Sequence, residues 1–505
     1  MIRAYDSAAI RAAEEPLLAA GVPLMREAAH ALALRAVRVL NDDGARVPGS
    51  VALALVGGGN NGGDALFAAA ELARRGLTVF AALCAADVHE EGLAAARAAG
   101  VRVRQIVGEE KAIDSEALIR IARRSGIWID GLAGIGLAGP LRDPLASIVE
   151  ALGEEKDSSP DEPVVIAVDV PSGVGGDGAV RGPLLRADIT VTMGAPKAGL
   201  LLPPAAEFAG EVEVVELGLP LAGAEHRVER LTGADVADLY PWPRRNDHKY
   251  TRGVVGLWTG SERYPGAAAL SVGGALAAGP GMVRYLGSAN GLPWVYPEAV
   301  TAEGRIQAAV VGSGMDDPGQ ARAALDEALS RGVPVVVDAG GLAELGPALE
   351  KRVDPAPIVA TPHAGELASL LGISRRAVES HPVLRARELA EKWGVVVLLK
   401  GPISVIAPPE GPLLTQEGET PWLATAGSGD VLAGITGTIL ALAQARAEEE
   451  GGALRDADVA RLAAASVWLH ARAGLRAATH AGGSGPIRAG DIARALPGVL
   501  AECDR

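Results

Sequence analysis

Three aspartates each follow a short apolar run in the first half of the chain. Asp64 ends the loop GGGNNGGD after VALALV, Asp130 closes GIWID, and Asp169 closes VVIAVD. If these runs are parallel strands, their carboxyl ends lie on one sheet edge, so the three carboxyl groups should face one cavity. Each aspartate could instead be a helix N-cap, but their joint occurrence favours a ligand site.

The polar residues around these aspartates are oxygen donors. Asparagine amides, carboxylates and the Ser172 hydroxyl suit a group 1 or group 2 cation better than zinc. The glycine-rich loop resembles a phosphate-binding turn but contains no lysine. A cation beside the acidic loop would offset its repulsion of a phosphate group.

The second half carries a different candidate site at the sequence AGSGD. Three N–H groups, those of Gly427, Ser428 and Gly429, precede an apolar helix and could form an anion hole. Asp430 could take a proton from a substrate hydroxyl as phosphate is delivered. A plain N-cap is the equally simple alternative for this stretch.

Two further residues in the second half follow apolar runs. Lys400 ends VVVLLK in a chain with only seven lysines, which indicates an anionic partner, although a surface lysine at a turn is the alternative. His363 in ATPHAGE begins a candidate helix, where a capping role is the more common one.

The elements expected to position these residues alternate between apolar strands and amphipathic helices. In the first half we expect strands at LTVFAALC, VRVRQIV, GIWIDGL, PVVIAVDVPS and DITVTMGAP. Uniformly apolar strands between helices predict a Rossmann-like, doubly wound α/β domain with a parallel sheet covered on both faces. A second α/β series runs through GVVGLWTGS, AAVVGSGM, VPVVVDAGG, PIVATPHAGE and VVVLLKGPISVIA. Strand signals weaken near residue 225, so we expect domains at 1–224 and 225–505.

The bulk composition limits the class of protein. With 505 residues, the chain is too long for one core, and 49% hydrophobic with 22% charged residues indicates a globular protein. A net charge of −15 and 3% aromatic residues argue against nucleic-acid binding. Neither a signal peptide nor a membrane span is evident, and the two cysteines form no disulfide framework, so we expect a cytoplasmic protein.

The motifs of the first half, in order, resemble the NAD(P)H-hydrate epimerase domain, the YjeF N-terminal family. The carrying segments are YDSAAIRAAEEPLLAAGVPLMREAA, GGGNNGGDALFAAAELARRG, WIDGLAGIGLAGPLRDP, AVDVPSGV and ADITVTMGAPKAGLL, over roughly residues 5–220. This family interconverts the R and S forms of NAD(P)H hydrated at C6 of the nicotinamide ring. The resemblance implies that Asp169 is the acid/base group and that Asn61, Asp130 and Ser172 bind potassium. The implied hydrate-binding residues are Asn60, Asn61, Gly62, Gly63, Asp64, Gly134, Ile135, Gly136, Leu137, Ala138, Gly139, Pro140 and Asp169. Ala138 stands where some relatives place a basic residue, so a second proton-transfer group is unassigned.

The second half, over about residues 230–500, resembles the ADP-dependent NAD(P)H-hydrate dehydratase, which has a ribokinase-like fold. The carrying segments include HKYTRGVVGLWTGSERYPGAAALSVGGAL, VVGSGM, ATPHAGELASLLG, VLLKGPISV and LATAGSGDVLAG. The resemblance implies that Asp430 activates the C6 hydroxyl of the S hydrate for phosphorylation by ADP or ATP, with magnesium as counterion. Implied hydrate contacts are Ala267, Gly314, His363 and Asp430. Implied nucleotide contacts are Lys400, Gly401, Pro402, Ile403, Ser404, Gly427, Ser428 and Gly429.

Five positions depart from the family pattern: Tyr250, Gly340, Ser404, Trp422 and Ala426. Together the two halves predict a bifunctional repair enzyme, which we expect to be a homo-oligomer. One alternative is a ribokinase-like kinase of a small alcohol, since Asp430 and an anion hole would also serve simple phosphoryl transfer. Another is that the first half is a non-catalytic ligand-binding module.

Overall fold

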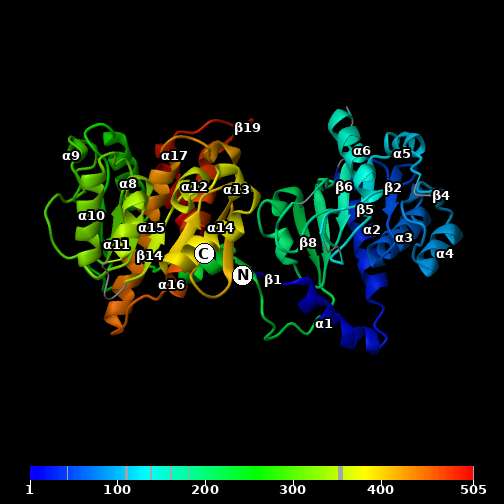
Figure 1. Cartoon of the computed structure of the whole chain (residues 1–505), viewed down its shortest axis with the longest axis horizontal. Coiled ribbons are helices and arrows are strands. Elements are labelled where there is room, and N and C mark those ends of the chain that lie inside the picture. Colours follow the sequence, from blue (N-terminus) through cyan, green and yellow to red (C-terminus); the bar gives the residue numbers. More distant parts are fainter. Residues whose placement is uncertain are drawn as a thin grey trace. The chain divides into compact units, whose positions relative to one another are not determined.

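The computed structural model describes most of the chain and divides it into two α/β units (Figure 1). One unit comprises Arg3–Val228, and the other comprises Glu229–Arg505 together with Met1–Ile2. The described residues are 1–42, 44–108, 112–136, 139–159, 162–180, 182–350 and 356–503.

The first unit is built on a seven-stranded sheet in the order β4-β3-β2-β5-β6-β7-β8, in which all neighbours pair in parallel. The strands are β2 (Val51–Val56), β3 (Thr78–Leu83), β4 (Arg102–Gln105), β5 (Ile127–Gly131), β6 (Val164–Val168), β7 (Ile189–Met193) and β8 (Glu211–Val215). The chain leaves β2 toward β3 on one side and later returns to place β5 on the other. Ligands bind at such a switch point in doubly wound folds.

Helices cover both faces of this sheet, as the apolar strands predict. Ala52, Ala54 and Val56 of β2 pack in one core with α2 and α3, whereas Leu53 and Leu55 pack in another with α5 and α6. Alternate residues of one strand thus reach opposite faces. The helices are α1 (Ser7–Ala19), α2 (Leu24–Asp42), α3 (Asn60–Arg74), α4 (Glu90–Ala98), α5 (Ser115–Ala122) and α6 (Leu145–Ser158), with short 3₁₀ helices η2 (Ala198–Leu200) and η3 (Ala205–Phe208).

The second unit is built on a ten-stranded sheet in the order β1-β9-β17-β16-β15-β14-β13-β12-β10-β11. The pairs from β11 to β15 are parallel, but β15 with β16 and β16 with β17 are antiparallel. The strands are β1 (Ile2–Ala4), β9 (Val228–Arg230), β10 (Val254–Trp258), β11 (Met282–Tyr285), β12 (Ala308–Val311), β13 (Val335–Val337), β14 (Ile358–Ala360), β15 (Val396–Leu399), β16 (Ile403–Ala407) and β17 (Leu413–Glu417), with a separate two-stranded ribbon of β18 (Thr479–His480) and β19 (Gly483–Ser484).

The segment VVVLLKGPISVIA contains two strands, the first of which ends just before Lys400. It forms β15 and β16, which reverse direction at Lys400, Gly401 and Pro402. Proline cannot continue a ladder and glycine permits the turn, so the chain folds back at this point. The reversal leaves Lys400 at the carboxyl end of a parallel strand.

Eleven described helices belong to the second unit, and two of them cross at very short range. A Cβ atom added to Gly434 of α15 would lie 2.0 Å from the carbonyl oxygen of Ser271 on α8, and one added to Gly274 of α8 would lie 2.4 Å from that of Val431. The helices are α7 (Gly233–Leu239), α8 (Pro265–Ala277), α9 (Leu292–Val295), α10 (Pro318–Ser330), α11 (Leu342–Leu349), α12 (Ala364–Leu371), α13 (Arg375–Ser380), α14 (Pro382–Trp393), α15 (Ser428–Glu449), α16 (Asp456–Ala478) and α17 (Ala489–Cys503).

Within the described ranges, every helix taken alone is too short or too polar to cross a membrane. The pair α1 and α2, bent by 113°, meets the criteria of length and composition only when its two helices are counted together.

Candidate active sites

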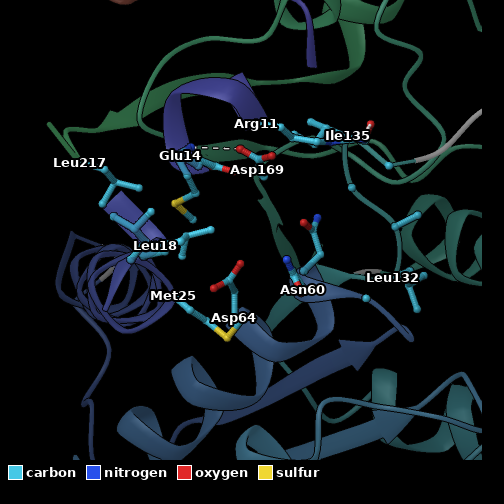
Figure 2. A pocket seen from close by; sticks show the side chains of 18 residues that line it. Arg11, Glu14, Leu18, Met25, Asn60, Asp64, Leu132, Ile135, Asp169 and Leu217 are labelled. Carbon is cyan, nitrogen blue, oxygen red and sulfur yellow. Dashed lines mark hydrogen bonds between the residues drawn. The ribbon is translucent and has the colours of Figure 1, made fainter. Parts of the chain in front are cut away.

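The first unit contains a cavity of about 540 Å³ between α1, α2 and the carboxyl ends of its central strands (Figure 2). Seven of the residues implied by the sequence line it, and they come from three separate segments. These are Asn60, Asn61, Asp64, Gly134, Ile135, Gly136 and Asp169. The structure therefore brings together the side chains that were expected at the ends of the strands.

The other implied residues of these two loops lie differently. Gly62 and Gly63 are buried in the first turn of α3, where a Cβ atom on Gly62 would lie 2.1 Å from the carbonyl oxygen of Gly57. Glycine is thus required at position 62 for close packing. Gly139 and Pro140 are exposed, and Leu137 and Ala138 fall outside the described residues.

Asp64 points into the cavity from the second turn of α3 (Figure 2). Its side chain has only 8% of its surface exposed, and its Oδ1 atom has no hydrogen-bond partner among the described residues. Burial, together with the negative charges of Asp169 and Glu14, raises the pKa of Asp64 well above its usual value, against the opposing charge of Lys197. Gly59 occupies the N-cap of α3, so the capping alternative for Asp64 is wrong.

Asp169 follows β6 with a positive φ of 68°, which is unusual for a residue with a side chain. Its Oδ1 accepts hydrogen bonds from the backbone N–H of Met193 at 3.0 Å, from the Thr192 hydroxyl at 3.2 Å, and from the Lys197 ammonium. The helix-capping alternative is therefore wrong for Asp169 as well. The strained backbone aims its carboxylate at the cavity.

Lys197 is a residue that the sequence interpretation missed. It is 2% exposed, and its Nζ donates to Asp169, to the carbonyl oxygen of Met193 at 2.7 Å and to the Thr192 hydroxyl at 3.2 Å. The scarcity of lysine that pointed to Lys400 applied equally to Lys197 in MGAPKAG. The ion pair supplies the positive charge that a buried carboxylate requires.

Asp130 and Ser172 form a buried polar contact at the next strand end. The Ser172 hydroxyl donates to Asp130 Oδ1 at 2.6 Å, and the Ser172 N–H donates to Asp130 Oδ2 at 2.8 Å. Asp130 is fully buried, and burial raises its pKa despite these hydrogen bonds. Asn61, the third implied cation ligand, instead donates from its amide to the carbonyl oxygen of Val168 at 2.7 Å and lies against Gly134.

Helix α1 contributes two charged residues that no sequence motif indicated. Glu14 lines the cavity, and Arg11 donates to the carbonyl oxygen of Ile135 at 2.9 Å. Burial raises the pKa of Glu14, although the charges of Lys197 and Arg11 oppose this. Helix α1 lies outside the strand–loop segments from which the site was predicted. Its position beside the strand ends is therefore known only from the folded structure.

The second unit centres on an ion pair between the partly buried Lys400 and the buried Asp338, whose Nζ and Oδ1 atoms lie 2.8 Å apart. Asp338 follows β13 and also accepts from the hydroxyls of Ser313 and Thr361, both at 2.8 Å. Burial acts to raise the pKa of Asp338, but the charge of Lys400 and these hydrogen bonds outweigh it and hold the pKa below its usual value. Asp338 is the main residue of this site that the sequence interpretation missed.

Asp430 lies in the first turn of α15, beside this pair. A Cβ atom on the adjacent Gly429 would lie 3.4 Å from Lys400 Nζ. Burial and the nearby charge of Asp338 raise the pKa of Asp430 to about 7, against the charge of Lys400. Gly427 is the N-cap of α15, in the left-handed conformation, so the cap alternative for Asp430 is wrong.

His363 is the N-cap of α12, as the capping interpretation expected. Its Nδ1 accepts from the N–H groups of Gly365 at 3.0 Å and Glu366 at 3.3 Å. A backbone bridge joins His363 to Lys400, and Glu366 lies 4.0 Å from the Lys400 ammonium. His363 thus reaches the edge of the same cluster while its other ring nitrogen faces Glu366.

The remaining implied residues of the second unit fall into groups. Ala267 and Gly314 are adjacent, because a Cβ on Gly314 would lie 2.4 Å from that of Ala267. Gly314 follows Ser313, whose hydroxyl donates a hydrogen bond to Asp338.

The implied nucleotide contacts lie on two elements. Ile403 and Ser404 are buried in β16, whereas Gly401 and Pro402 are exposed at the turn before it. Ser428 is buried and bonded to His470 at 3.1 Å, and burial lowers the pKa of that histidine to about 4.

Comparison with known proteins matches both units. A family model described as YjeF-related protein N-terminus matches residues 22–199, and one described as NAD(P)H-hydrate dehydratase matches residues 255–497. A bifunctional NAD(P)H-hydrate repair enzyme of Mycobacterium leprae is 41% identical over 456 residues, covering 88% of this chain and 90% of the relative. The corresponding enzyme of Thermofilum pendens is 36% identical, with 83% of each chain covered.

Two shorter proteins match one half each. An NAD(P)H-hydrate epimerase of Clavibacter michiganensis is 49% identical over 228 residues, covering 44% of this chain and 92% of the relative. Among solved structures, an ADP/ATP-dependent NAD(P)H-hydrate dehydratase from Bacillus subtilis, co-crystallised with ATP and Mg²⁺, is 27% identical. It has a TM-score of 0.46 and covers 54% of this chain and 97% of its own.

Proposed function

Since this chain belongs to the family of bifunctional NAD(P)H-hydrate repair enzymes, we propose that its two units divide the repair between them. The enzyme epimerises the R and S hydrates of NAD(P)H and dehydrates the S hydrate with ADP. In our proposal residues 1–224 carry the epimerase and residues 225–505 the dehydratase. The alternative of a small-alcohol kinase is not favoured, because relatives matching over most of the chain are hydrate-repair enzymes.

The observation that carries this division is that each unit has its own ion pair between a lysine and a buried aspartate, beside a second carboxyl group. Asp169 pairs with Lys197 in the first unit, and Asp338 pairs with Lys400 in the second. Two titratable carboxyl groups in different environments are suited to separate acid and base roles. Each unit thus has groups of the kind that proton transfer requires.

In the epimerase, Asp169 is the acid/base group acting at the C6 hydroxyl. The hydrate would be held by Asn60, Asn61 and Asp64, and by the loop that runs from Gly134 through Leu137, Ala138 and Gly139 to Pro140. The Asp169 carboxylate takes the hydroxyl proton as the ring hemiaminal opens and returns it as the ring closes. Its three hydrogen-bond donors fix the carboxylate in place.

A potassium ion is proposed at Asn61, Asp130 and Ser172. The donor set fits a hard monovalent cation, since it offers carboxylate, hydroxyl and carbonyl oxygens close together, with Ser172 Oγ 2.6 Å from Asp130 Oδ1 and 3.2 Å from the carbonyl oxygen of Ala133. A bound cation would supply positive charge for the polar groups of the hydrate. Asp130 and Ser172 would hold it directly behind the loop at Gly134.

Replacing potassium with a bulky organic cation at constant ionic strength should weaken hydrate binding to the epimerase. We expect the KM for epimer exchange to rise about tenfold, which is the effect expected from the loss of one charge-assisted contact to the hydrate. The measurement is epimer exchange without ADP, so that dehydration does not contribute. The Asp130→Asn variant should already have the raised KM in potassium. Its KM should change little further when the organic cation replaces potassium. An unchanged wild-type KM would contradict the cation site.

In the dehydratase, Asp430 takes the proton of the C6 hydroxyl as this oxygen receives the phosphoryl group of ADP. Phosphate then leaves C6 together with a proton from C5, which restores the ring double bond. Ala267, Gly314 and His363 would position the hydrate so that its hydroxyl faces Asp430. The raised pKa of Asp430 suits a general base that works near neutral pH.

The nucleotide would lie between the start of α15 and the turn before β16. The N–H groups of Gly427, Ser428 and Gly429 would form the anion hole, for which that of Ser428 must leave the carbonyl oxygen of Thr425 at 3.2 Å, and Lys400 would supply positive charge. Gly401, Pro402, Ile403 and Ser404 would contact the rest of the nucleotide. Magnesium, which prefers oxygen ligands, would be held by the acidic groups near Lys400, Asp338 and Glu366, and would supply positive charge to the phosphates.

Lys400→Ala should weaken ADP binding about 10–100-fold, because it removes a charged hydrogen-bond donor from an anionic ligand. It should also lower the melting temperature, since Asp338 is left buried without its cation. ADP affinity is measured by titration calorimetry on the folded variant. Lys392→Ala, which changes an exposed lysine of α14, is the matched control and should change neither property. Wild-type ADP affinity in Lys400→Ala would exclude Lys400 from the nucleotide site.

The division of labour is tested by giving the enzyme pure R hydrate. With ADP, reduced-nicotinamide absorbance should return completely, because epimerisation feeds the S-specific dehydratase. Without ADP, the R hydrate should only equilibrate with the S form, as followed by chromatography. Absorbance that does not return with ADP would contradict the dehydratase assignment, and R hydrate that stays unchanged would contradict the epimerase assignment.

A further inference from the structure

The Asp64 side chain has an environment that hydrate binding alone does not explain. It is more than nine-tenths buried, its Oδ1 atom has no partner among the described residues, and it faces the epimerase cavity. An ionised carboxylate in such a place would lack the hydrogen bonds that buried charge requires. Burial and the unpartnered Oδ1 atom therefore favour the protonated form of this carboxyl group, which could give up a proton.

Asp169 has the opposite environment in the same cavity. Three donors, including the buried Lys197 ammonium, surround its Oδ1 atom and stabilise a carboxylate. Figure 2 shows the two carboxyl groups directed into the same space, Asp64 from α3 and Asp169 from the end of β6. One cavity thus contains two carboxyl groups in different environments, one with an unpartnered oxygen and one with three donors, which is the arrangement that acid and base pairs require.

We propose that Asp64 is the second proton-transfer group of the epimerase, acting as a general acid toward the ring nitrogen while Asp169 acts as the base. This inference rests on the proposed role of Asp169. Opening of the hemiaminal needs both groups, since one proton leaves the C6 hydroxyl and another must reach the departing nitrogen.

The step balances with these two residues alone. Asp169 takes the hydroxyl proton, the C6–O bond becomes a carbonyl, and the C6–N1 bond breaks with its electron pair going to N1. Asp64 gives its proton to N1. After rotation about the C5–C6 bond, N1 attacks the other face of the carbonyl, its proton returns to Asp64, and Asp169 returns a proton to the oxygen. Both residues regain their initial states.

Glu14 is the competing candidate in this cavity, and the structure favours Asp64 over it. Glu14 is only partly buried, so water can solvate its charge, whereas Asp64 is almost inaccessible. Two cations, Lys197 and Arg11, act on Glu14, while Lys197 alone opposes the protonated form of Asp64. Burial therefore favours the protonated form of Asp64 more than that of Glu14.

The test is epimer exchange from pure R hydrate, without ADP, by the full chain. Asp64→Asn keeps the size of the side chain but cannot donate a carboxyl proton, so kcat should fall about 10²–10⁴-fold while KM changes less than about tenfold. Asp64→Glu, which keeps the acid, should retain about tenfold more kcat than Asp64→Asn. The control on the same helix is Glu71→Gln, outside the cavity, which should exchange epimers at the wild-type rate.

Several results would overturn the assignment. A wild-type kcat in Asp64→Asn would contradict the acid role. If KM rose strongly while kcat stayed unchanged, Asp64 would contribute to hydrate binding but not to proton transfer. Equal losses in Asp64→Asn and Asp64→Glu would also contradict it, because the acid would then confer no advantage. If Asp169→Asn loses exchange and Asp64→Asn keeps it, the role of Asp169 stands and that of Asp64 fails. Epimer exchange at the wild-type rate in Asp169→Asn would contradict the roles of both Asp169 and Asp64.

Discussion

Replacing Asp430 with asparagine should lower ADP-dependent dehydration of the S hydrate about 10²–10⁴-fold, the usual contribution of a general base. The variant should still fold and bind ADP, because the N–H groups of α15 and Lys400 are unchanged. Gly427 is the N-cap, so the substitution removes no cap. The measurements are kcat for dehydration, ADP affinity and melting temperature on one preparation. Asp326→Asn, an exposed aspartate of α10 paired with Arg322, is the matched control. Near-normal turnover in Asp430→Asn would remove the catalytic role.

The pH dependence of the wild-type enzyme follows from the same residue. Only the carboxylate of Asp430 can take a proton, so kcat/KM for dehydration should fall as pH decreases through about 7. Stability should change in the opposite sense. A pKa raised from 3.8 to about 7 gives stabilisation that is complete below about pH 4 and is lost as pH rises to about 7. Asp430→Asn should lack this contribution.

Replacing Asp169 with asparagine should abolish epimer exchange, with a loss of at least about 10²-fold, and leave dehydration of pure S hydrate intact. Asparagine cannot take the hydroxyl proton, and the dehydratase residues belong to the other unit. Exchange is measured by chromatography of R and S hydrates, and dehydration by return of absorbance with ADP. Asp114→Asn, at the N-cap of α5, is the matched control, since asparagine also caps helices well.

Asp169→Asn also leaves Lys197 buried without its anion, which should lower the melting temperature. The double variant Asp169→Asn with Lys197→Met removes both charges and should recover part of this loss. Exchange should stay absent in the double variant, which separates the chemical role from the structural one. Epimer exchange at the wild-type rate in either folded variant would show that Asp169 is not the acid/base group.

The sequence was sufficient to locate the groups at the strand ends of the first unit. Apolar runs predict parallel strands, and the ends of parallel strands share one edge, so Asp64 and Asp169 could be expected to face the same cavity before any coordinates. The sequence could not separate their roles. The difference depends on Lys197 and on Asp64 Oδ1, which has no hydrogen-bond partner in the described part of the chain, and both are properties of the packed structure.

Other residues were missed for different reasons. Lys197 and Asp338 carried usable signals, since one is a rare lysine and the other follows an apolar strand, yet no motif argument drew on them. Glu14 had no such signal, because it lies on an N-terminal helix that reaches the cavity only through folding. The strand end at Lys400 was expected, but the antiparallel pairing of the two strands on either side of it was not, because the sequence alone does not give the direction of pairing.

The close crossing of α8 and α15 limits how this enzyme can diverge. Backbone meets backbone at Gly274 and Gly434, so one added carbon atom at either position must push apart the helix that begins at the anion hole. The position of Asp430 is therefore fixed by a backbone contact about one turn further along the same helix. A lineage can vary the outer surface of these helices freely, but a substitution at this crossing is a change in the active site.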